Sequence, residues 1–187
     1  MRLFFAIELA DDVQDLLDEA TAGLRAEAPE LAWVDRQKRH LTLKFLGDVA
    51  DDALPRLAEA GDRAAARHGP LEMSIHEIGA FPNFRRARVV WIGVEQERRL
   101  ELLHHDLELA CESAGFEVEG RPFRPHITLA RVRSQLPVDH LKGLARMARS
   151  VRLHATVVVE RIILFESLLA PSGARYRSVH SATLGGR

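Results

Sequence analysis

Apolar residues recur along the chain with two periods, one typical of strands and one typical of helices. Runs of apolar and β-branched residues predict strands at residues 2–9, 33–34, 40–46, 71–79, 88–95, 116–119, 126–132, 151–159, 161–168 and 176–183. Apolar stripes at helical spacing predict helices at residues 12–27, 51–68, 97–114 and 138–149. We expect Asp11 and Asp12 to cap the first helix.

The two halves of the chain follow one rhythm of strand, helix, strand, helix and further strands. This rhythm predicts an internal duplication of architecture. Short strands mixed with helices, without strict alternation, favour an α+β fold with mainly antiparallel sheets. Because no linker or low-complexity segment divides the 187 residues, we expect a single domain over residues 1–187.

One four-residue pattern occurs twice, at corresponding points of the two halves, as His40-Leu41-Thr42-Leu43 and His126-Ile127-Thr128-Leu129. Side chains alternate between the two faces of a strand, so the histidine and threonine of each motif share one face. The aliphatic residues share the other. The sequence therefore predicts two imidazoles, each beside a hydroxyl, on two strands with apolar backs.

These residue types suit in-line displacement at a phosphorus centre. One group must take a proton from the nucleophile, and another must protonate the leaving oxygen on the far side. Histidine serves both roles near neutral pH because its ordinary pKa is about 6.5. Threonine hydroxyls can donate hydrogen bonds to the non-bridging oxygens, where negative charge grows. This chemistry needs neither a metal nor a cofactor.

Other interpretations of the histidines are weaker. A single His-x-Thr on a strand is usually structural, and the second instance is what favours function. A zinc site is disfavoured because no cysteine lies near the motifs and neither motif face carries Asp or Glu. The chain has no glycine-rich phosphate loop and no nucleophile-elbow serine.

Composition limits the partners and the cellular compartments that fit the protein. The net charge is −1, although the 26 basic residues are nearly all arginine, whose planar fork suits phosphate. The one cysteine, Cys111, excludes an internal disulfide and fits a reducing compartment. No apolar run approaches the roughly 18 residues needed to cross a bilayer. We expect a cytoplasmic protein with no membrane partner.

The chain resembles the two-histidine (2H) phosphoesterase superfamily, defined by paired His-x-Thr/Ser motifs. Within it, the chain is most similar to the RNA 2′,3′-cyclic phosphodiesterases, also called 2′-5′ RNA ligases. The similar segments are residues 2–9 (RLFFAIEL), 40–47 (HLTLKFLG), 81–85 (FPNFR), 91–94 (WIGV) and 123–131 (FRPHITLAR). The resemblance extends over nearly the whole chain.

The resemblance implies two pseudo-symmetric lobes, with antiparallel sheets facing across a central cleft and helices packed outside. It implies that water opens an RNA 2′,3′-cyclic phosphate end to a 2′-phosphate end. His126 would be the base that activates water, and His40 the acid that protonates the departing 3′ oxygen. Thr42 and Thr128 would hold the phosphate oxygens. The family can also join tRNA halves through a 2′-5′ bond. The expected partner is therefore RNA, and we expect a monomer.

Supporting roles come from the residues themselves. Lys44 has the strand parity of His40 and would face the cleft on an unbroken strand. Arg131 has the opposite parity and reaches the site only if its strand bends or ends there. The aromatic residues Phe45, Phe84 and Tyr176 are candidates to stack a terminal base. The loop arginines Arg85, Arg86 and Arg88 are candidates to contact the RNA backbone.

Two further functions stay open at this point. The same chemistry could act on 2′-5′-linked oligonucleotides or on small cyclic nucleotides. The protein could instead be a non-catalytic module that binds an RNA end through its histidines. Two complete acid/base motifs argue against the binding module, because binding alone does not need two titrating groups.

Overall fold

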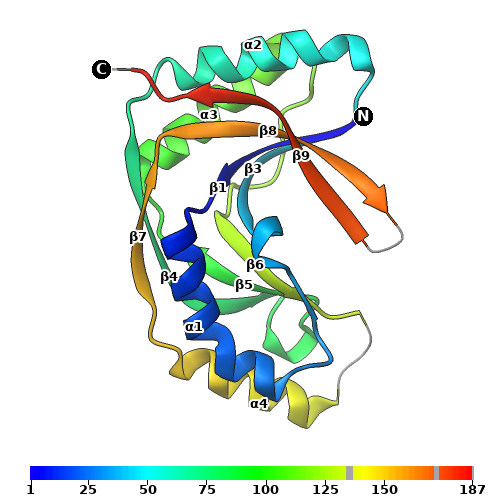
Figure 1. The fold of residues 1–187 in the computed structure, drawn as a ribbon, viewed down its shortest axis with the longest axis vertical. Helices are drawn as coiled ribbons and strands as arrows, with labels where there is room; N and C mark the ends of the chain where they lie inside the picture. The colour runs from blue at the N-terminus through cyan, green and yellow to red at the C-terminus, as the bar shows by residue number, and fades with distance from the viewer. Residues whose placement is uncertain (134–136, 171–172, 187) are drawn as a thin grey trace.

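The computed structural model describes residues 1–133, 137–170 and 173–186, and these form helices packed on an antiparallel sheet (Figure 1). The strands are β1 (Arg2–Glu8), β2 (Ala32–Trp33), β3 (His40–Asp48), β4 (Leu71–Phe81), β5 (Val89–Val94), β6 (His126–Arg131), β7 (His154–Val159), β8 (Arg161–Ala170) and β9 (Gly173–Thr183). The α-helices are α1 (Asp11–Glu27), α2 (Leu54–Ala65), α3 (Arg98–Ser113) and α4 (Val138–Ser150), with 3₁₀ turns at Arg36–Lys38, Asp51–Ala53 and Phe84–Arg86. The α+β class is confirmed.

The nine strands form one sheet in the order β7-β4-β5-β6-β3-β1-β8-β9, with β2 paired to β6. The motif strands β3 and β6 lie at its centre and pair only through Leu41 and Ile127. The order is symmetric about this junction, because β1 flanks β3 as β5 flanks β6. The two expected sheets are thus two halves of a single sheet, joined where the motif strands meet.

Each half of the sheet has its own helical cover. We define lobe A as β1, β3, β8 and β9 with α2 and α3, and lobe B as β4 to β7 with α1 and α4. Figure 1 shows α2 and α3 at one end of the molecule and α1 and α4 at the other. Each lobe takes strands from both halves of the chain. Among the described residues, no helix has the length and apolar character to cross a membrane.

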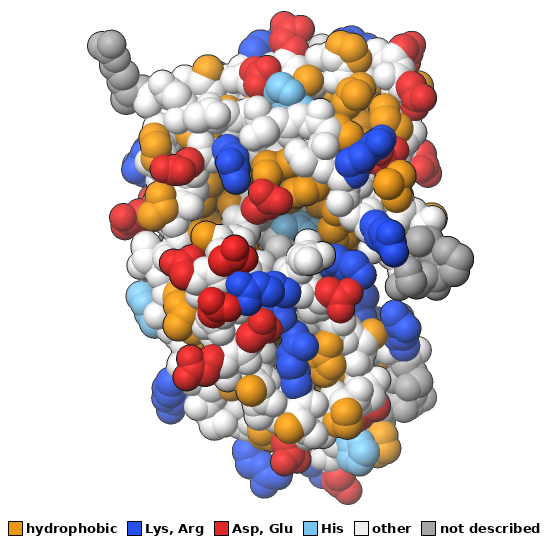
Figure 2. Space-filling model, viewed as in Figure 1, with side chains coloured by type: hydrophobic (Ala, Val, Ile, Leu, Met, Phe, Trp, Pro, Cys, Tyr) orange, Lys and Arg blue, Asp and Glu red, His pale blue; other side chains and the backbone are white. Residues whose placement is uncertain are grey.

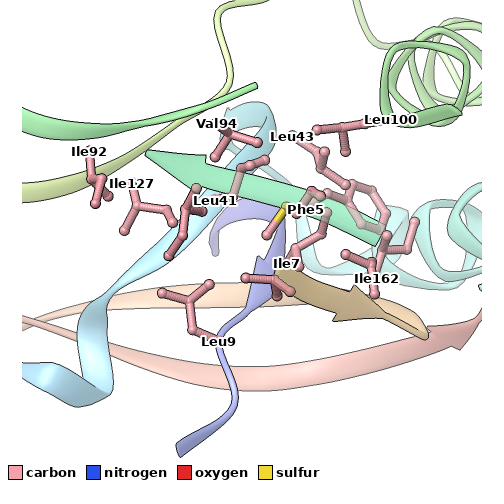
Figure 3. Close-up of a cluster of buried hydrophobic side chains, with 14 of the residues drawn as sticks. Phe5, Ile7, Leu9, Leu41, Leu43, Ile92, Val94, Leu100, Ile127 and Ile162 are labelled. Atoms are coloured by element: carbon pink, nitrogen blue, oxygen red, sulfur yellow. The ribbon is translucent and has the colours of Figure 1, made fainter. Parts of the chain in front are cut away.

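The apolar positions of the motifs form the back of the sheet. Leu41 and Ile127 are fully buried, and Leu43 and Leu129 are at most 4% exposed. Figure 3 shows Leu41 between Ile127 and the side chains of β1, with Leu43 toward Leu100 of α3. Burying one such side chain contributes about 1.5–3 kcal/mol. This packing fixes which face of each motif strand points away from the core.

Several local predictions were wrong, and the strand predicted at 151–159 and the helix predicted at 51–68 are both shorter, at His154–Val159 and Leu54–Ala65. Residues 116–119 form no strand, although apolar and acidic residues alternate there, because no strand edge pairs with them and Val118 is left exposed. The first helix begins at Asp11 itself, and its N-cap residue is Ala10, with no side-chain capping bond. The last strand begins at Gly173 and not at residue 176, because its pairing with β8 extends to the end of that hairpin.

We predict that Leu41→Ala lowers the free energy of unfolding by about 2–5 kcal/mol, because it opens a cavity at the residue pair that links β3 to β6. Urea denaturation followed by circular dichroism measures this loss. The matched control is Leu169→Ala, since Leu169 is 79% exposed and its truncation is expected to change stability by less than about 0.5 kcal/mol. Equal losses in the two variants would contradict the prediction.

Candidate active site

The pairing of β3 with β6 brings the four polar motif side chains together. Because the strands are antiparallel and Leu41 pairs with Ile127, His40 lies across from Thr128 and Thr42 lies across from His126. All four side chains line one cavity of about 700 Å³. Each imidazole is therefore placed beside the hydroxyl of its own motif and opposite the hydroxyl of the other.

Each histidine ring is held by a backbone carbonyl oxygen two residues before it. His40 Nδ1 lies 2.8 Å from the carbonyl oxygen of Lys38, and His126 Nδ1 lies 2.7 Å from the carbonyl oxygen of Arg124. A carbonyl oxygen only accepts hydrogen bonds, so Nδ1 of each neutral ring carries the proton and donates it. This tautomer leaves Nε2 of each ring as the nitrogen that can accept or donate a proton in the cavity.

Aromatic side chains pack around both rings. The centroid of His40 is 4.9 Å from that of Phe4 and 5.2 Å from that of Tyr176, which meets it edge-on. The centroid of His126 is 5.0 Å from that of Phe81, again edge-on, and 6.4 Å from that of Trp91. These contacts limit rotation of the imidazoles, so the Nε2 atoms are preorganised.

The site favours the neutral form of His40. Burial lowers the pKa of His40 to about 4, against an ordinary value of 6.5, and the hydrogen bond to Lys38 only partly opposes this. The positive charges of Arg131 and protonated His126 lower the pKa further. At neutral pH the free protein therefore carries an unprotonated His40.

Both motif strands bulge at their fourth residue. Along β1 and β3, Ala6 pairs with Thr42 and Phe5 with Lys44, so Leu43 is passed over. Along β5 and β6, Trp91 pairs with Thr128 and Val90 with Ala130, so Leu129 is passed over in the same way. A bulge shifts the side-chain alternation by one residue. Counting each histidine as the first residue, the sixth residue of the strand, not the fifth, then shares the cavity face.

The bulges explain where the supporting residues lie. Phe45 and Arg131 are these sixth residues, and both line the cavity, as does Tyr176. The expectation that Lys44 faces the cleft and attracts phosphate assumed an unbroken strand, whereas β3 has a bulge at Leu43. Lys44 lies in the cavity wall but is only 4% exposed, and its ammonium is paired with Glu108.

The predicted loop residues lie outside the cavity. Arg85 is exposed in the 3₁₀ turn Phe84–Arg86, and it is not among the residues that line the cavity. Phe84 is half-buried and packs against the core. The sequence reasoning also missed the wall residues Phe81 and Phe123, which line the cavity. Both stand in the segments that carry the family resemblance, so their place in those segments was the available signal.

Charge over the molecule is mixed. On the face shown in Figure 2, acidic and basic side chains are interspersed, in keeping with the net charge of −1. Within residues 1–133, 137–170 and 173–186, no group of three or more His, Cys, Asp or Glu side chains is arranged to hold a metal ion. Among the residues that line the cavity, the imidazoles of His40 and His126, the hydroxyls of the two motif threonines and the guanidinium of Arg131 form a set suited to a phosphate group.

Two successive stretches of the chain, residues 7–91 and 92–176, each match the family model of LigT-like phosphoesterases. The chain is 31% identical over 176 residues to the RNA 2′,3′-cyclic phosphodiesterase of Methanothermobacter thermautotrophicus, covering 94% of this chain and 95% of that protein. It is 34% identical over 128 residues to the protein of that name from Geobacillus stearothermophilus, covering 68% of this chain and 41% of the relative.

Solved structures share the whole fold. The crystal structure of a protein from Thermus thermophilus superposes with a TM-score of 0.83 at 30% identity, covering 100% of both chains. Escherichia coli LigT, crystallised with 3′-AMP, superposes with a TM-score of 0.74 at 27% identity, covering 98% of this chain and 97% of that one. The boundary between the two family matches falls inside β5, so each match begins in a strand that flanks a motif strand.

We predict that the His40 ring of the free protein titrates near pH 4 and that Arg131→Gln raises this pKa, because it removes a positive charge that disfavours protonation. NMR of the imidazole resonances across pH 3–8 measures both values. The folded protein binds this proton less readily than the unfolded chain. The free energy of unfolding should therefore fall as the pH falls from 6.5 toward about 4. A His40 ring that titrates near 6.5 would contradict the prediction.

Proposed function

The chain belongs to the LigT-like phosphoesterase family, and on this basis we propose that it hydrolyses RNA 2′,3′-cyclic phosphate ends to 2′-phosphate ends without a metal. The observation that carries the proposal is the pair of His-x-Thr motifs, which hold both imidazoles in one tautomer around one cavity. The names of the relatives and the 3′-AMP complex of Escherichia coli LigT support an RNA-end substrate.

In the proposed reaction the cyclic phosphate lies between the two motif strands. His126 Nε2 takes a proton from water as the water oxygen bonds to phosphorus. The bond from phosphorus to the 3′ oxygen breaks, and His40 Nε2 gives its proton to that oxygen. The products are a 2′-phosphate and a 3′-hydroxyl, with His126 protonated and His40 neutral. Proton exchange with solvent restores the starting state.

The threonines act on the charge that develops during this step. Thr42 and Thr128 lie on opposite strands, each across from a histidine, so their hydroxyls can donate to two different non-bridging oxygens. Such preorganised donors count most where negative charge grows in the transition state. Loss of one such donor typically costs about 2.7–4 kcal/mol in the activation free energy.

The negative charge of the substrate promotes protonation of His40 by solvent. In the free protein the His40 pKa is about 4, so the acid is unprotonated at neutral pH. A phosphodiester carries one negative charge, and a negative charge beside an imidazole favours its protonated form. Binding of the substrate therefore raises the His40 pKa. The acid is charged only when there is a phosphate to act on.

The assignment of His40 as the acid also orients the nucleoside. The 3′ oxygen belongs to the terminal ribose, so the ribose and its base lie on the His40 side of the phosphate, in lobe A. That side offers Phe45, which is 61% exposed, together with Tyr176. Both can stack on a base whatever its identity. Water, or the 5′-hydroxyl of an RNA acceptor in a 2′-5′ ligation, enters from the His126 side.

We predict that the two histidines respond differently to the leaving group. His40→Ala and His126→Ala should each lower turnover of a cyclic phosphate end by about 10²–10⁴-fold. On bis(p-nitrophenyl) phosphate, His40→Ala should lose little, because p-nitrophenolate leaves without a proton. His126→Ala should remain impaired, because water still needs a base. The steady-state rates on both substrates measure this.

The matched control for these two variants is His154→Ala, an exposed histidine at the start of β7. It should retain full activity on both substrates, and circular dichroism should show all three variants folded. If His126→Ala retains activity on the p-nitrophenyl ester and His40→Ala does not, the acid and base are assigned the wrong way round.

We predict that RNA with a 2′,3′-cyclic phosphate end yields a 2′-phosphate end in excess chelator. Mass spectrometry with phosphatase mapping identifies the phosphate isomer. A parallel reaction with a 5′-hydroxyl RNA acceptor measures 2′-5′ ligation, in which that hydroxyl replaces water.

Stoichiometric binding with no product would support the RNA-end-binding module. Turnover only of 2′-5′-linked oligonucleotides or small cyclic nucleotides would support the other substrate classes. Loss of activity in chelator, restored by zinc, would overturn metal independence.

A further inference from the structure

A buried ion pair lies in the wall of the catalytic cavity and has no part in the proposed chemistry. Lys44 Nζ is 2.6 Å from Glu108 Oε2, and the two side chains are only 3% and 5% exposed. Lys44 follows the bulge in β3, and its side chain reaches α3, which carries Glu108. Glu108 Oε1 has no hydrogen-bond partner among the described residues. Burying two charges and an oxygen without a hydrogen bond costs free energy, so the ion pair needs an explanation beyond packing.

The pair holds the segment of residues 117–124, which leads into the second motif. Lys44 Nζ donates a hydrogen bond of 2.8 Å to the carbonyl oxygen of Glu117. Glu108 Oε2 accepts a hydrogen bond of 3.0 Å from the backbone N–H of Glu119. Residues 117–122 belong to no helix or strand and are exposed, so no regular ladder of backbone bonds fixes them. The buried pair replaces that ladder.

A second contact from the same helix holds the far end of the segment. His104 lies one turn before Glu108 on α3, and its ring stacks on Phe123 with centroids 3.9 Å apart and planes 11° apart. Its Nε2 lies 3.7 Å from Glu108 Oε1. Two side chains of α3 therefore contact the segment, Glu108 at the backbone of Glu119 and His104 at the ring of Phe123.

This segment ends at the atom that orients a catalytic histidine. The carbonyl oxygen of Arg124 fixes the tautomer and ring angle of His126 through its contact with Nδ1. Any shift of residues 117–124 moves this carbonyl and therefore the direction of Nε2. The path runs from Lys44 and Glu108, through the backbone at Glu119, to the ring of His126.

The first motif has a parallel arrangement built from the equivalent helix. Arg39, which precedes His40, is 4% exposed and donates hydrogen bonds to Gln14 and Asp18, four residues apart on α1. It also donates to the carbonyl oxygen of Val34. In both halves, then, the helix before the motif strand uses two side chains one turn apart to hold the chain entering the motif.

We propose that Lys44 and Glu108 are positioning residues that hold residues 117–124 and so aim His126 at the phosphate. The proposal rests on the proposed function for its kinetic consequences. A purely stabilising role is a weak explanation of the pair, because replacing a buried ion pair by apolar side chains of similar size often leaves stability unchanged or raised. A single variant can therefore distinguish a positioning role from a stabilising role.

The test is the double variant Lys44→Met/Glu108→Leu, which keeps the volume and removes the ion pair and its hydrogen bonds to the backbone of Glu117 and Glu119. We expect its melting temperature to stay within a few degrees of the parent protein. Its kcat on a cyclic phosphate end should fall by about 100-fold, since a displacement of about 1 Å can cost that much. KM should change little, because Phe45, Tyr176 and Arg131 are untouched. Hydrogen exchange of the peptide covering residues 116–125 should become fast.

The matched control is Asp106→Asn on the same helix. Asp106 pairs with His68 and Arg67, and it is not a partner in any of the bonds that hold residues 117–124. We expect unchanged kcat and unchanged exchange of residues 116–125 in this variant. A double variant with kcat within about twofold of the parent protein, and with slow exchange of the segment, would overturn the proposal.

Two further measurements cover other outcomes. If the double variant does not fold, Lys44→Arg keeps the charge and the donors, and it should retain kcat within about 10-fold. In the parent protein the amide of Glu119 should exchange slowly, and exchange at the rate of an unstructured peptide would overturn the proposal. The exchange data need no substrate. An inactive parent protein with a protected segment would therefore refute the proposed function alone.

Discussion

The site depends on a single point of contact between two strands. β3 and β6 pair only at Leu41 and Ile127. The pair sets the register, so it decides which hydroxyl faces which imidazole. The polar side chains on both sides of the pair line one cavity. The apolar backs of both motifs are buried in one core, so packing behind the sheet stabilises the contact.

Much of this arrangement could be predicted from the sequence, and the limits have physical causes. Alternation placed His40 with Thr42 and His126 with Thr128 on one face of each strand, because that relation spans only two residues. It did not foresee the burial of Lys44 against Glu108, because the passed-over Leu43 shifts the alternation of the residues directly after it. Arg131 reaches the cavity for the same reason. The sequence does not mark either bulge, since Leu43 and Leu129 are ordinary strand residues and only the pairing with β1 and β5 reveals them.

The strand predicted at 116–119 failed for a different reason. Alternating apolar and acidic residues are typical of a half-buried strand, but a strand also needs an edge to pair with, and pairing is a long-range property. Here the backbone groups find side-chain partners on β3 and α3 instead. The segment thus resembles a strand in composition, while its hydrogen bonds are those of a tethered loop.

The duplication explains how one symmetric framework came to serve an asymmetric reaction. The phosphate needs two imidazoles and two hydroxyls, and these four groups, their tautomers and the bulges after them are the same in both motifs. The positions after the bulge differ. Lys44 corresponds to Ala130, and Phe45 corresponds to Arg131. An RNA end is also unlike on its two sides, with a flat base on one and open solvent or a second strand on the other. In the proposed reaction, divergence at the fifth and sixth positions therefore orients the substrate without disturbing the groups that react, because those positions are the first whose side chains are not fixed by the central pair.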